Sequence, residues 1–412
     1  MLNQNYLIKL LDGANVEWLP LGDICDVKNG YTPSKSKPEL WANGTIPWFR
    51  MEDIRKNGRV LNDSLQHVTK EAVKSGKLFP ANSIILSTTA TIGEHALITE
   101  DFLCNDLLTV LSIKKEFKDI INHKYLFYYG YALGELCKKN ATPGVFALVG
   151  TTKIKTFEIP IPCPENPEKS LKIQAEIVRI LDNFTALTAE LTAELTARKT
   201  QYEHYRDTLL TFKEDEVEWK PLGKSIIRTK GVNITASKMK VIHKDNAPVK
   251  IFAGGKTFAF VNFDDIPLEN INKEPSIIVK SRGIIEFEYY DKPFSHKNEM
   301  WSYHSKDENI SIKYIYYFLK TKESYFQRLG SKMQMPQIAT PDTDKFLIPI
   351  PFPNDPKKSL EEQQRIVDIL DKFDTLTNSI SDGLPREIKL RQQQYEYYRD
   401  MLFNFPKNSE VK

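Results

Sequence analysis

The most constraining feature of this chain is an uninterrupted helical stretch at residues 170–212, which contains neither glycine nor proline. Its apolar residues recur at alternating spacings of four and three, the heptad pattern of a helix that packs against another helix. These residues are Ile173, Ile177, Ile180, Phe184, Leu187 and Leu191. At ~1.5 Å per residue the helix would be about 63 Å long, longer than a typical domain is wide. We therefore predict a rod-like spacer, or half of one.

A near-copy of the first part of this helix lies toward the end of the sequence. Residues 157–185 read FEIPIPCPENPEKSLKIQAEIVRILDNFT, and residues 346–374 read FLIPIPFPNDPKKSLEEQQRIVDILDKFD, at an offset of 189. The apolar stripe of the second copy is Ile366, Ile369, Phe373 and Leu376. We predict that the two stripes pair the helices with each other.

The two copies also share a second block but differ before it. QYEHYRD at 201–207 matches QYEYYRD at 394–400 at an offset of 193, so the second copy has four extra residues. There SDGLPRE at 381–387 stands in place of a tandem Thr-Ala-Glu-Leu at 188–195. Because glycine and proline disrupt helices, we predict a break in the second helix near 381–385.

A third repeat marks the start of each half of the chain. VEWLPLG at 16–22 matches VEWKPLG at 217–223. Three ordered repeats of this size predict a pseudo-two-fold symmetric architecture of two domains and two helices, not a solenoid of short units. The predicted parts are a first domain at 1–158, a long helix at 159–213, a second domain at 214–347 and a second helix at 348–412.

The N-terminal residues resemble the end of the long helix. Residues 5–11 predict a short helix similar to residues 207–212, so the sequence begins where a repeat unit ends. A chain that begins in this way can close its pseudo-two-fold if Tyr6, Leu7 and Leu10 pack near Leu402.

Each domain has the sequence pattern of a mixed α/β fold. Residues 83–93 predict a short strand of β-branched residues that runs into a Ser/Thr loop, and residues 273–287 parallel them. Residues 122–136 and 311–326 predict amphipathic helices whose aromatic stripes belong to the domain cores.

The charge distribution does not by itself indicate nucleic-acid binding. The net charge is +3, and residues 1–167 and 214–356 are each nearly neutral, unlike a domain that grips DNA alone. Basic character is local, in two loops where the alternative is solvated surface. These lysines are Lys28, Lys35 and Lys37, and Lys230, Lys238, Lys240, Lys244, Lys250 and Lys256.

Cysteine usage and hydropathy indicate a reduced cytoplasmic protein. The four cysteines have no CxxC spacing and predict neither a zinc site nor a disulfide framework. The N-terminus has no apolar signal-peptide core, and no run approaches the ~18 apolar residues of a membrane span.

No catalytic motif is complete. GGKT at 254–257 is not a phosphate-binding loop, because Lys250 occupies the position of the first glycine. No Asn-Pro-Pro-aromatic tetrapeptide, HExxH or GxSxG is present, and PDTDK at 341–345 lacks the spacing of a nuclease motif. A self-contained methyltransferase or nuclease is therefore disfavoured.

Over essentially its full length the chain resembles the specificity subunit of type I restriction-modification systems. The residues that carry the resemblance are the paired IPIP-x-P…SL…Q…IV-x-ILD-x-F blocks, the Thr-Ala-Glu-Leu tandem, the QYE-x-YRD blocks and the VEW-x-PLG starts. GYTPSKSKPELWANGTIPW at 30–48 is also similar to the opening of one type of target-recognition domain. The resemblance implies an α/β fold in which two target-recognition domains are separated by two conserved helices that form an antiparallel coiled coil.

The resemblance also implies partners and cofactors. Each domain would read one half of a bipartite sequence in double-stranded DNA, and the helices would set the spacing. Such a subunit is not catalytic: it docks two modification subunits, which carry S-adenosylmethionine and methylate adenine. Restriction subunits that use ATP and Mg²⁺ then join. The alternative is a coiled-coil adaptor whose two heads bind proteins, which rod symmetry and neutral charge would suit equally.

Direct readout of bases requires polar side chains on loops that reach groove edges. The candidates in the first domain are Tyr31, Thr32, Ser34, Lys35, Arg50, Ser87, Thr88, Thr89 and Thr91. Those in the second are Lys230, Asn233, Lys256, Ser281, Arg282, Lys297, Asn298 and Gln334. For each residue the alternative is a phosphate contact or ordinary surface. Arg282 is the sharpest prediction, because it lies in a Ser-Arg-Gly loop after a strand.

The tandem Thr-Ala-Glu-Leu yields a testable prediction. Four residues advance a helix by ~6 Å and turn it by roughly 400°, so one more tetrad keeps the apolar stripe nearly in phase. DNA rises ~3.4 Å per base pair. We expect insertion of a tetrad after Leu195 to lengthen the unread spacer between half-sites by one or two base pairs, as methylation mapping on randomised sites would show. An unchanged spacer, or altered half-site bases, would contradict this and leave the tract as ordinary helix.

Overall fold

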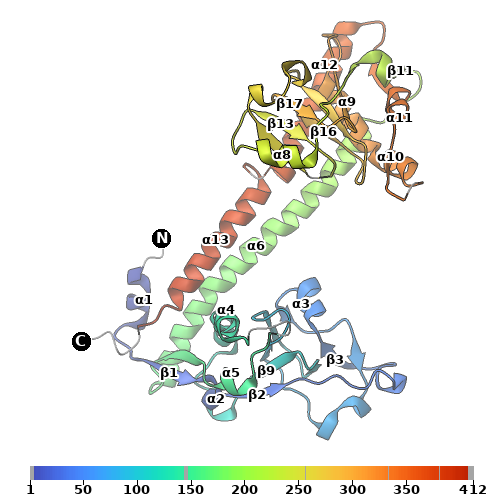
Figure 1. Ribbon diagram of the computed structural model, residues 1–412. Helices are drawn as coiled ribbons and strands as arrows, with labels where there is room; N and C mark the ends of the chain where they lie inside the picture. The colour runs from blue at the N-terminus through green and yellow to red at the C-terminus, as the bar shows by residue number, and fades with distance from the viewer. Residues whose placement is uncertain (1–3, 143–146, 256, 333, 380, 407–412) are drawn as a thin grey trace. The chain divides into compact units, whose positions relative to one another are not determined.

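The computed structural model describes residues 4–142, 147–255, 257–332, 334–379 and 381–406 (Figure 1). The chain forms two compact units. Unit 1 comprises Met1–Glu190 with Ile388–Lys412, and unit 2 comprises Leu191–Glu387. Each unit has an α/β part, which we call its head, and contains segments of the long helices. The α/β fold class predicted from the sequence is confirmed.

The head of unit 1 has three layers, with a sheet in the middle. Ile84 and Leu86 point to a cluster that includes α4 (His123–Asn140), whereas Ile85 between them joins a different cluster on the other face. This alternation is why Ser83–Ser87 is apolar throughout its interior: both faces of the strand are covered. The five-stranded sheet has the order β2 (Cys25–Asn29), β9 (Leu108–Ile113), β6 (Ser83–Ser87), β7 (His95–Ile98) and β4 (Val60–Leu61), and the smaller sheet has the order β5 (His67–Val68), β3 (Ile46–Phe49) and β8 (Leu103–Cys104).

The head of unit 2 repeats this arrangement. Ile277 and Val279 face the cluster that contains α9 (Ile312–Thr321), and Ile278 faces the second layer. The larger sheet has the order β12 (Ile227–Thr229), β18 (Trp301–His304), β15 (Ser276–Lys280) and β16 (Glu286–Tyr290), and the smaller one the order β14 (Phe258–Val261), β13 (Val249–Phe252) and β17 (Phe294–His296). The predicted parallel between residues 83–93 and 273–287 is confirmed, since β6 and β15 occupy equivalent places.

Shorter elements complete the units. The remaining helices of the heads are α2 (Leu21–Ile24), α3 (Met51–Asn57), α5 (Thr151–Lys155), α7 (Leu222–Ser225), α8 (Ala236–Ile242), α10 (Glu323–Gly330) and α11 (Thr340–Asp344). Single 3-10 turns lie at Pro38–Leu40, Lys70–Ala72, Lys74–Gly76, Lys115–Phe117, Phe263–Asp265 and Leu268–Asn270.

In both units the VEW-x-PLG repeat at the start of the head pairs with the IPIP repeat at its end. β1 (Val16–Pro20) runs antiparallel to β10 (Glu158–Pro162), and β11 (Val217–Pro221) runs antiparallel to β19 (Leu347–Pro351). Each ribbon has only two strands, so every strand is an edge, where proline is tolerated. The VEW and IPIP repeats are therefore two sides of one structural clasp at the base of each head.

The long helices are α6 (Pro167–Leu209), α12 (Pro356–Asn378) and α13 (Leu384–Leu402). The predicted break near 381–385 is confirmed, because no helix covers Ser379 or residues 381–383. Gly383 has φ +91°, and a Cβ there would lie 2.4 Å from the carbonyl oxygen of Thr375. Only glycine fits this bend without strain.

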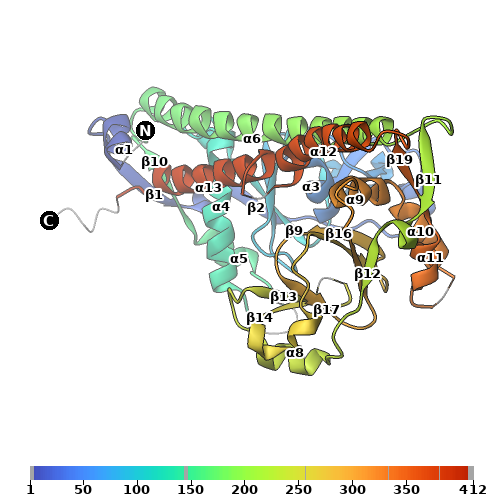
Figure 2. The same ribbon diagram turned by 90° about the horizontal axis from the view of Figure 1, so that it is seen from above.

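The apolar stripe has two kinds of neighbour. Tyr398 of α13 stacks on Phe184 with 5.3 Å between ring centroids in unit 1, where both views show the end of α13 beside α6 (Figures 1 and 2). In unit 2 Tyr205 stacks on Phe373 at 5.4 Å. Helix pairing is thus confirmed at these two phenylalanines. Leu187, Leu191, Ile369 and Leu376 are half-buried, and their pairing stays a prediction.

The early part of each stripe packs into a head as well, which the sequence analysis did not predict. In unit 1 the buried cluster that contains Leu402 and the α4 tyrosines also holds Ile173, Ile177 and Ile180. Ile366 lies in the corresponding cluster of unit 2. The reason is that each helix begins directly after its clasp, so its first turns face the head.

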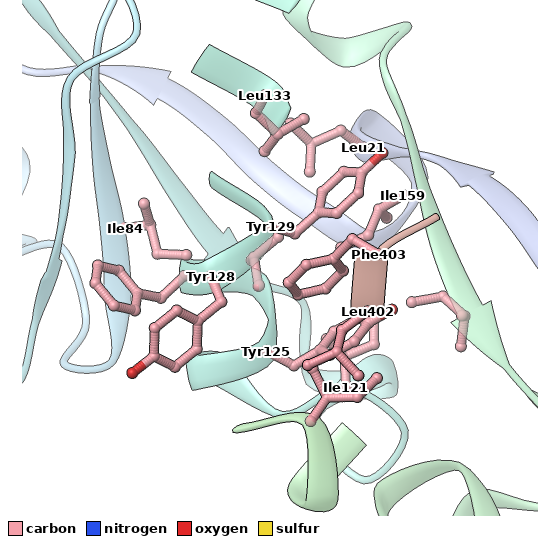
Figure 3. Close-up of a cluster of buried hydrophobic side chains, with 14 of the residues drawn as sticks. Leu21, Ile84, Ile121, Tyr125, Tyr128, Tyr129, Leu133, Ile159, Leu402 and Phe403 are labelled. Atoms are coloured by element: carbon pink, nitrogen blue, oxygen red, sulfur yellow. The ribbon is translucent and has the colours of Figure 1, made fainter. Parts of the chain in front are cut away.

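The N-terminal helix packs as predicted. α1 (Gln4–Leu11) places Leu7 in the same cluster as Leu402, with Tyr6 and Leu10 packed against it, and the Tyr6 hydroxyl donates to Glu176 at 2.9 Å. Figure 3 shows Leu402 and Phe403 beside Tyr125 and Tyr129 of α4 in this cluster. Helix α1 and the end of α13 therefore pack into one cluster at the base of unit 1.

A buried glutamine joins each head to its long helix. In unit 1 Gln174 donates to the Ile120 carbonyl oxygen at 2.7 Å and accepts from the Asn122 backbone N–H at 2.9 Å. In unit 2 Gln363 makes the equivalent bonds to the Asn309 carbonyl oxygen and the Ser311 N–H. Both glutamines are fully buried. Each satisfies two backbone groups at the start of a head helix, which would otherwise be unpaired away from water.

We expect Gln174→Ala and Gln363→Ala each to destabilise the protein by about 1–3 kcal/mol, because each leaves buried backbone groups without partners. Urea denaturation measures the change. Gln364→Ala is the matched control, since this neighbouring residue is exposed and its side chain donates to Asp368 on its own helix. Its stability should stay within about 0.5 kcal/mol of the parent. Equal effects at 363 and 364 would contradict the assigned role.

Candidate nucleic-acid interface

The two heads present equivalent hairpin loops, one after β6 and one after β15. The unit 1 loop is residues 88–94, and the Val149 N–H donates to the Thr88 carbonyl oxygen at 3.0 Å. The unit 2 loop is residues 281–285, and the Ile338 N–H donates to the Ser281 carbonyl oxygen at 3.0 Å. Because equivalent segments of the two heads hold the two loops, the loops occupy corresponding positions, although their sequences differ.

The unit 2 loop is fixed on both sides. The Ser281 hydroxyl donates to the Glu299 carbonyl oxygen, and the Gly283 N–H donates to the Pro336 carbonyl oxygen at 2.9 Å. The Gln327 side chain donates to the Ile285 carbonyl oxygen at 3.0 Å, and Ile285 is buried. Gly283 has φ +74°, which turns the chain at the apex. The loop is therefore preorganised, and its exposed side chains are presented from a rigid base.

The Arg282 side chain is available for a ligand. It is exposed, and within the described part of the chain its guanidinium makes no hydrogen bond or ion pair, although its charge contributes to lowering the pKa of Glu299. Two other basic candidates are already paired: Lys297 with Glu299 at 2.7 Å, and Arg50 with Glu52 at 3.0 Å. A free guanidinium on a rigid loop can make the bidentate contact that reads guanine O6 and N7.

Two other lysines of the unit 2 head are neutralised by neighbouring glutamates. Lys280 contacts both Glu286 at 2.5 Å and Glu288 at 2.7 Å, and Lys250 contacts Glu288 at 3.3 Å. Lys250 also lies 4.1 Å from the ring centroid of Phe252. Such pairing leaves little net positive potential, in agreement with the near-neutral charge of the head.

Three of the residues predicted to contact DNA bases stabilise the loops from within the heads. Ser87, Thr88 and Ser281 are buried. The Ser87 hydroxyl donates to the Thr89 carbonyl oxygen at 2.9 Å, and the Thr88 hydroxyl lies 3.3 Å from that of Thr109. Their burial argues against direct base contact, because the strand must bury its last residues to anchor the hairpin.

Two candidates on the 31–35 segment have internal partners. The Tyr31 hydroxyl donates to the Ala72 carbonyl oxygen at 3.0 Å, and Thr32 donates to Asp106 at 2.6 Å. Thr89 and Thr91 are half-buried in the unit 1 loop. The exposed candidates are Ser34, Lys35, Lys230, Asn233, Asn298 and Gln334. Lys256 lies outside the described residues.

Sequence reasoning missed the apolar residues at the loop. Ile284 is 60% exposed and Met335 is 63% exposed. The only available signal was the Ile284-Ile285 pair, in which strand alternation allows just one isoleucine to be buried. Arg59 was missed too: it donates to the His95 carbonyl oxygen at 3.1 Å, pairs with Glu94 of the unit 1 loop, and lies 5.2 Å from the Tyr131 ring centroid.

The described residues show neither a metal cluster nor a membrane span. Nowhere among them do three His, Cys, Asp or Glu side chains come together in a way that could hold a metal ion. In the same ranges no helix is long and apolar enough to cross a bilayer.

Two equivalent heads that carry different loops define a protein with two separate recognition surfaces. A model of the type I restriction modification DNA specificity domain matches residues 14–198 and 218–390. The chain is 45% identical over 390 residues to the EcoprrI specificity subunit of a type I restriction enzyme from Escherichia coli, with 93% of each chain covered. It is 38% identical over 427 residues to the EcoR124I/EcoR124II specificity subunit from Escherichia coli, with 100% of each covered.

Solved structures share the fold. The S subunit of a type I restriction-modification system from M. genitalium has a TM-score of 0.56 at 15% identity, over 96% of this chain and 98% of that one. A chain from a study of complex assembly in the type I R-M system has a TM-score of 0.57 at 14% identity, over 94% and 97%. The chain belongs to the type I restriction-modification specificity subunits, and its heads are two target-recognition domains.

Each head contains a buried histidine whose lowered pKa predicts a loss of stability in acid. Burial lowers the pKa of His95, which follows the unit 1 loop, to about 3, and that of His296 in unit 2 to about 4. An unfolded histidine has a pKa of about 6.5, so below that pH the unfolded chain binds protons that the folded chain rejects. Stability should therefore fall as the pH drops from about 6.5 toward 4.

We expect the midpoint of urea unfolding to be lower at pH 5.0 than at pH 7.5. His95→Phe keeps an aromatic ring against Phe127 and should reduce this pH-dependent difference, whatever its effect on absolute stability. His204→Phe, at an exposed position on α6, is the control and should leave the difference unchanged. An undiminished difference in the His95 variant would refute the assignment.

Proposed function

We propose that each head reads one half of a bipartite sequence in double-stranded DNA, and that the long helices set the spacing and dock two modification subunits. The observation that most supports this proposal is that the contacts between head and helix recur in both units, whereas the exposed loops differ in sequence. Lys124 pairs with Asp182 and Lys313 with Asp371, both at 2.7 Å. Equivalent head-to-helix junctions that carry different loops suit a protein that reads two unlike half-sites.

In this proposal the chain is not itself catalytic. S-adenosylmethionine would be held by the modification subunits, which methylate adenine, and ATP and Mg²⁺ by restriction subunits that join them. The near-neutral heads fit this division, because partners that surround the DNA would supply many of the phosphate contacts. Family membership and the incomplete catalytic motifs support this role.

The QYE-x-YRD blocks are the proposed docking surfaces for the modification subunits. Tyr205 and Tyr398 stack on phenylalanines of the long helices, so these two serve the helix packing. Tyr397, in contrast, is 62% exposed, and its counterpart His204 is also exposed. Duplicated exposed faces predict two copies of one partner.

Co-expression with the modification subunit tests the proposal. Native mass spectrometry should show two modification subunits per chain, and methylation mapping on randomised duplexes should return a split target. A complex that holds a single modification subunit at saturation would reject the docking proposal. A complex that methylates without sequence preference would favour the alternative, an adaptor with two protein-binding heads.

Arg282→Ala should relax specificity at one base pair of one half-site. Loss of a bidentate guanine contact costs about 1–3 kcal/mol of discrimination. Competition between duplexes altered at single positions measures it. Lys224→Ala, which also removes an exposed charge from this head but lies outside the candidate set, is the control and should leave the base preference unchanged. Parental affinity and specificity in the Arg282 variant would rule out the contact.

A further inference from the structure

An apolar side chain shares the rigid loop of unit 2 with Arg282. Ile284 is 60% exposed, although its neighbour Ile285 is only 1% exposed. The loop buries Ser281 and Ile285 at its ends and exposes the three residues between them. Ile284 therefore adds little to the core, and its exposure comes from the hydrogen bonds that hold the loop.

Met335 lies on the segment that braces this loop. The Gly283 N–H donates to the carbonyl oxygen of Pro336, the residue after Met335, and Arg282 pairs through its backbone with Gln337. Met335 is itself 63% exposed. The loop and its brace thus present two flexible or branched apolar groups next to one unpaired guanidinium.

This combination matches the chemistry of the major groove. Guanine offers O6 and N7 there, which an arginine contacts with two hydrogen bonds, and thymine offers its C5-methyl group, which an apolar side chain contacts. The Cα atoms of Arg282 and Ile284 are two residues apart and so at most about 7 Å from each other. That distance corresponds to one or two steps of ~3.4 Å along a DNA strand.

The corresponding loop of unit 1 has different chemistry. Its exposed apex is Ala90, with φ +56°, between Thr89 and Thr91, and its large aliphatic side chain, Ile92, is half-buried and packs against the core cluster of unit 1. The inference therefore concerns unit 2 alone.

We propose that Ile284, with Met335 exposed on the bracing segment, contacts the C5-methyl group of a thymine one or two base pairs from the guanine that Arg282 contacts. This rests on the proposed function, because it assigns a base-reading role to a loop of a DNA-recognition domain. The contact buries one methyl group against an aliphatic side chain, so it adds to specificity without needing a charge.

The test uses the full chain in complex with its modification subunits and the duplex found by methylation mapping. Deoxyuridine, which lacks only the methyl group, replaces each thymine of both half-sites in turn. At one thymine we expect affinity to fall on the order of fourfold, the size expected for one methyl group returned to water. Ile284→Ala should bind the thymine and uracil duplexes equally well, and Ile284→Val should retain part of the difference.

Val241→Ala is the matched control. Val241 is an aliphatic residue of α8 in the same head and is 83% exposed. This variant should keep the parental thymine preference, which separates a local contact from a general loss of surface apolar area.

The outcomes separate this inference from the proposed function. If the complex binds its target specifically but tolerates uracil at every position, the methyl contact is wrong and the proposed function stands. If Ile284→Ala keeps the full uracil effect, another residue reads the methyl group and the assignment fails. If Ile284→Ala instead lowers the number of bound modification subunits, the apolar pair is a protein contact. A complex with no sequence preference would refute both proposals.

Discussion

The junction between each head and its long helix is the interaction on which the structure depends. A fully buried glutamine bonds to two backbone groups at the start of a head helix, Gln174 in unit 1 and Gln363 in unit 2. Buried amides are costly when unpaired, so this geometry tolerates little slippage. A half-exposed ion pair, Lys124 with Asp182 and its counterpart in unit 2, adds a second contact to the same helices.

Because this junction between head and helix is fixed, the loops can differ in sequence without disturbing it. The hairpin loops depend on their own strands and on one bracing segment, residues 147–149 in unit 1 and 334–338 in unit 2. Their exposed residues contribute little to the cores. Sequence changes at the tip of a loop therefore leave the junction between head and helix intact. This is the property expected of domains that recognise different targets.

The electrostatics of the heads fit a role shared with partners. Lys280 and Lys250 are held by glutamates on the same face, and Lys297 is held by Glu299. Arg282 stands out because its guanidinium is unpaired among the described residues. This charge distribution agrees with the proposal that recognition in unit 2 depends on a few directed groups, with general attraction to the DNA backbone supplied by other subunits.

The sequence by itself determined that the chain is built from two equivalent halves. The repeats at offsets of 189, 193 and 201 predicted the equivalent heads and the helices, because repeated segments bury the same faces in the same way, whereas the pairing of the start and exit repeats into clasps appeared only in the structure. Gly383 and Pro385 predicted the helix break for a local reason, their backbone preferences. Tertiary structure alone decided which polar residues face outward. Ser87 and Arg282 both lie in strand-to-loop segments, yet one is buried and the other exposed, since strand pairing and the bracing segment set the orientation of each side chain. The same long-range packing directs Ile284 outward and Ile285 into the core, and neighbouring residues in the sequence do not specify that contact.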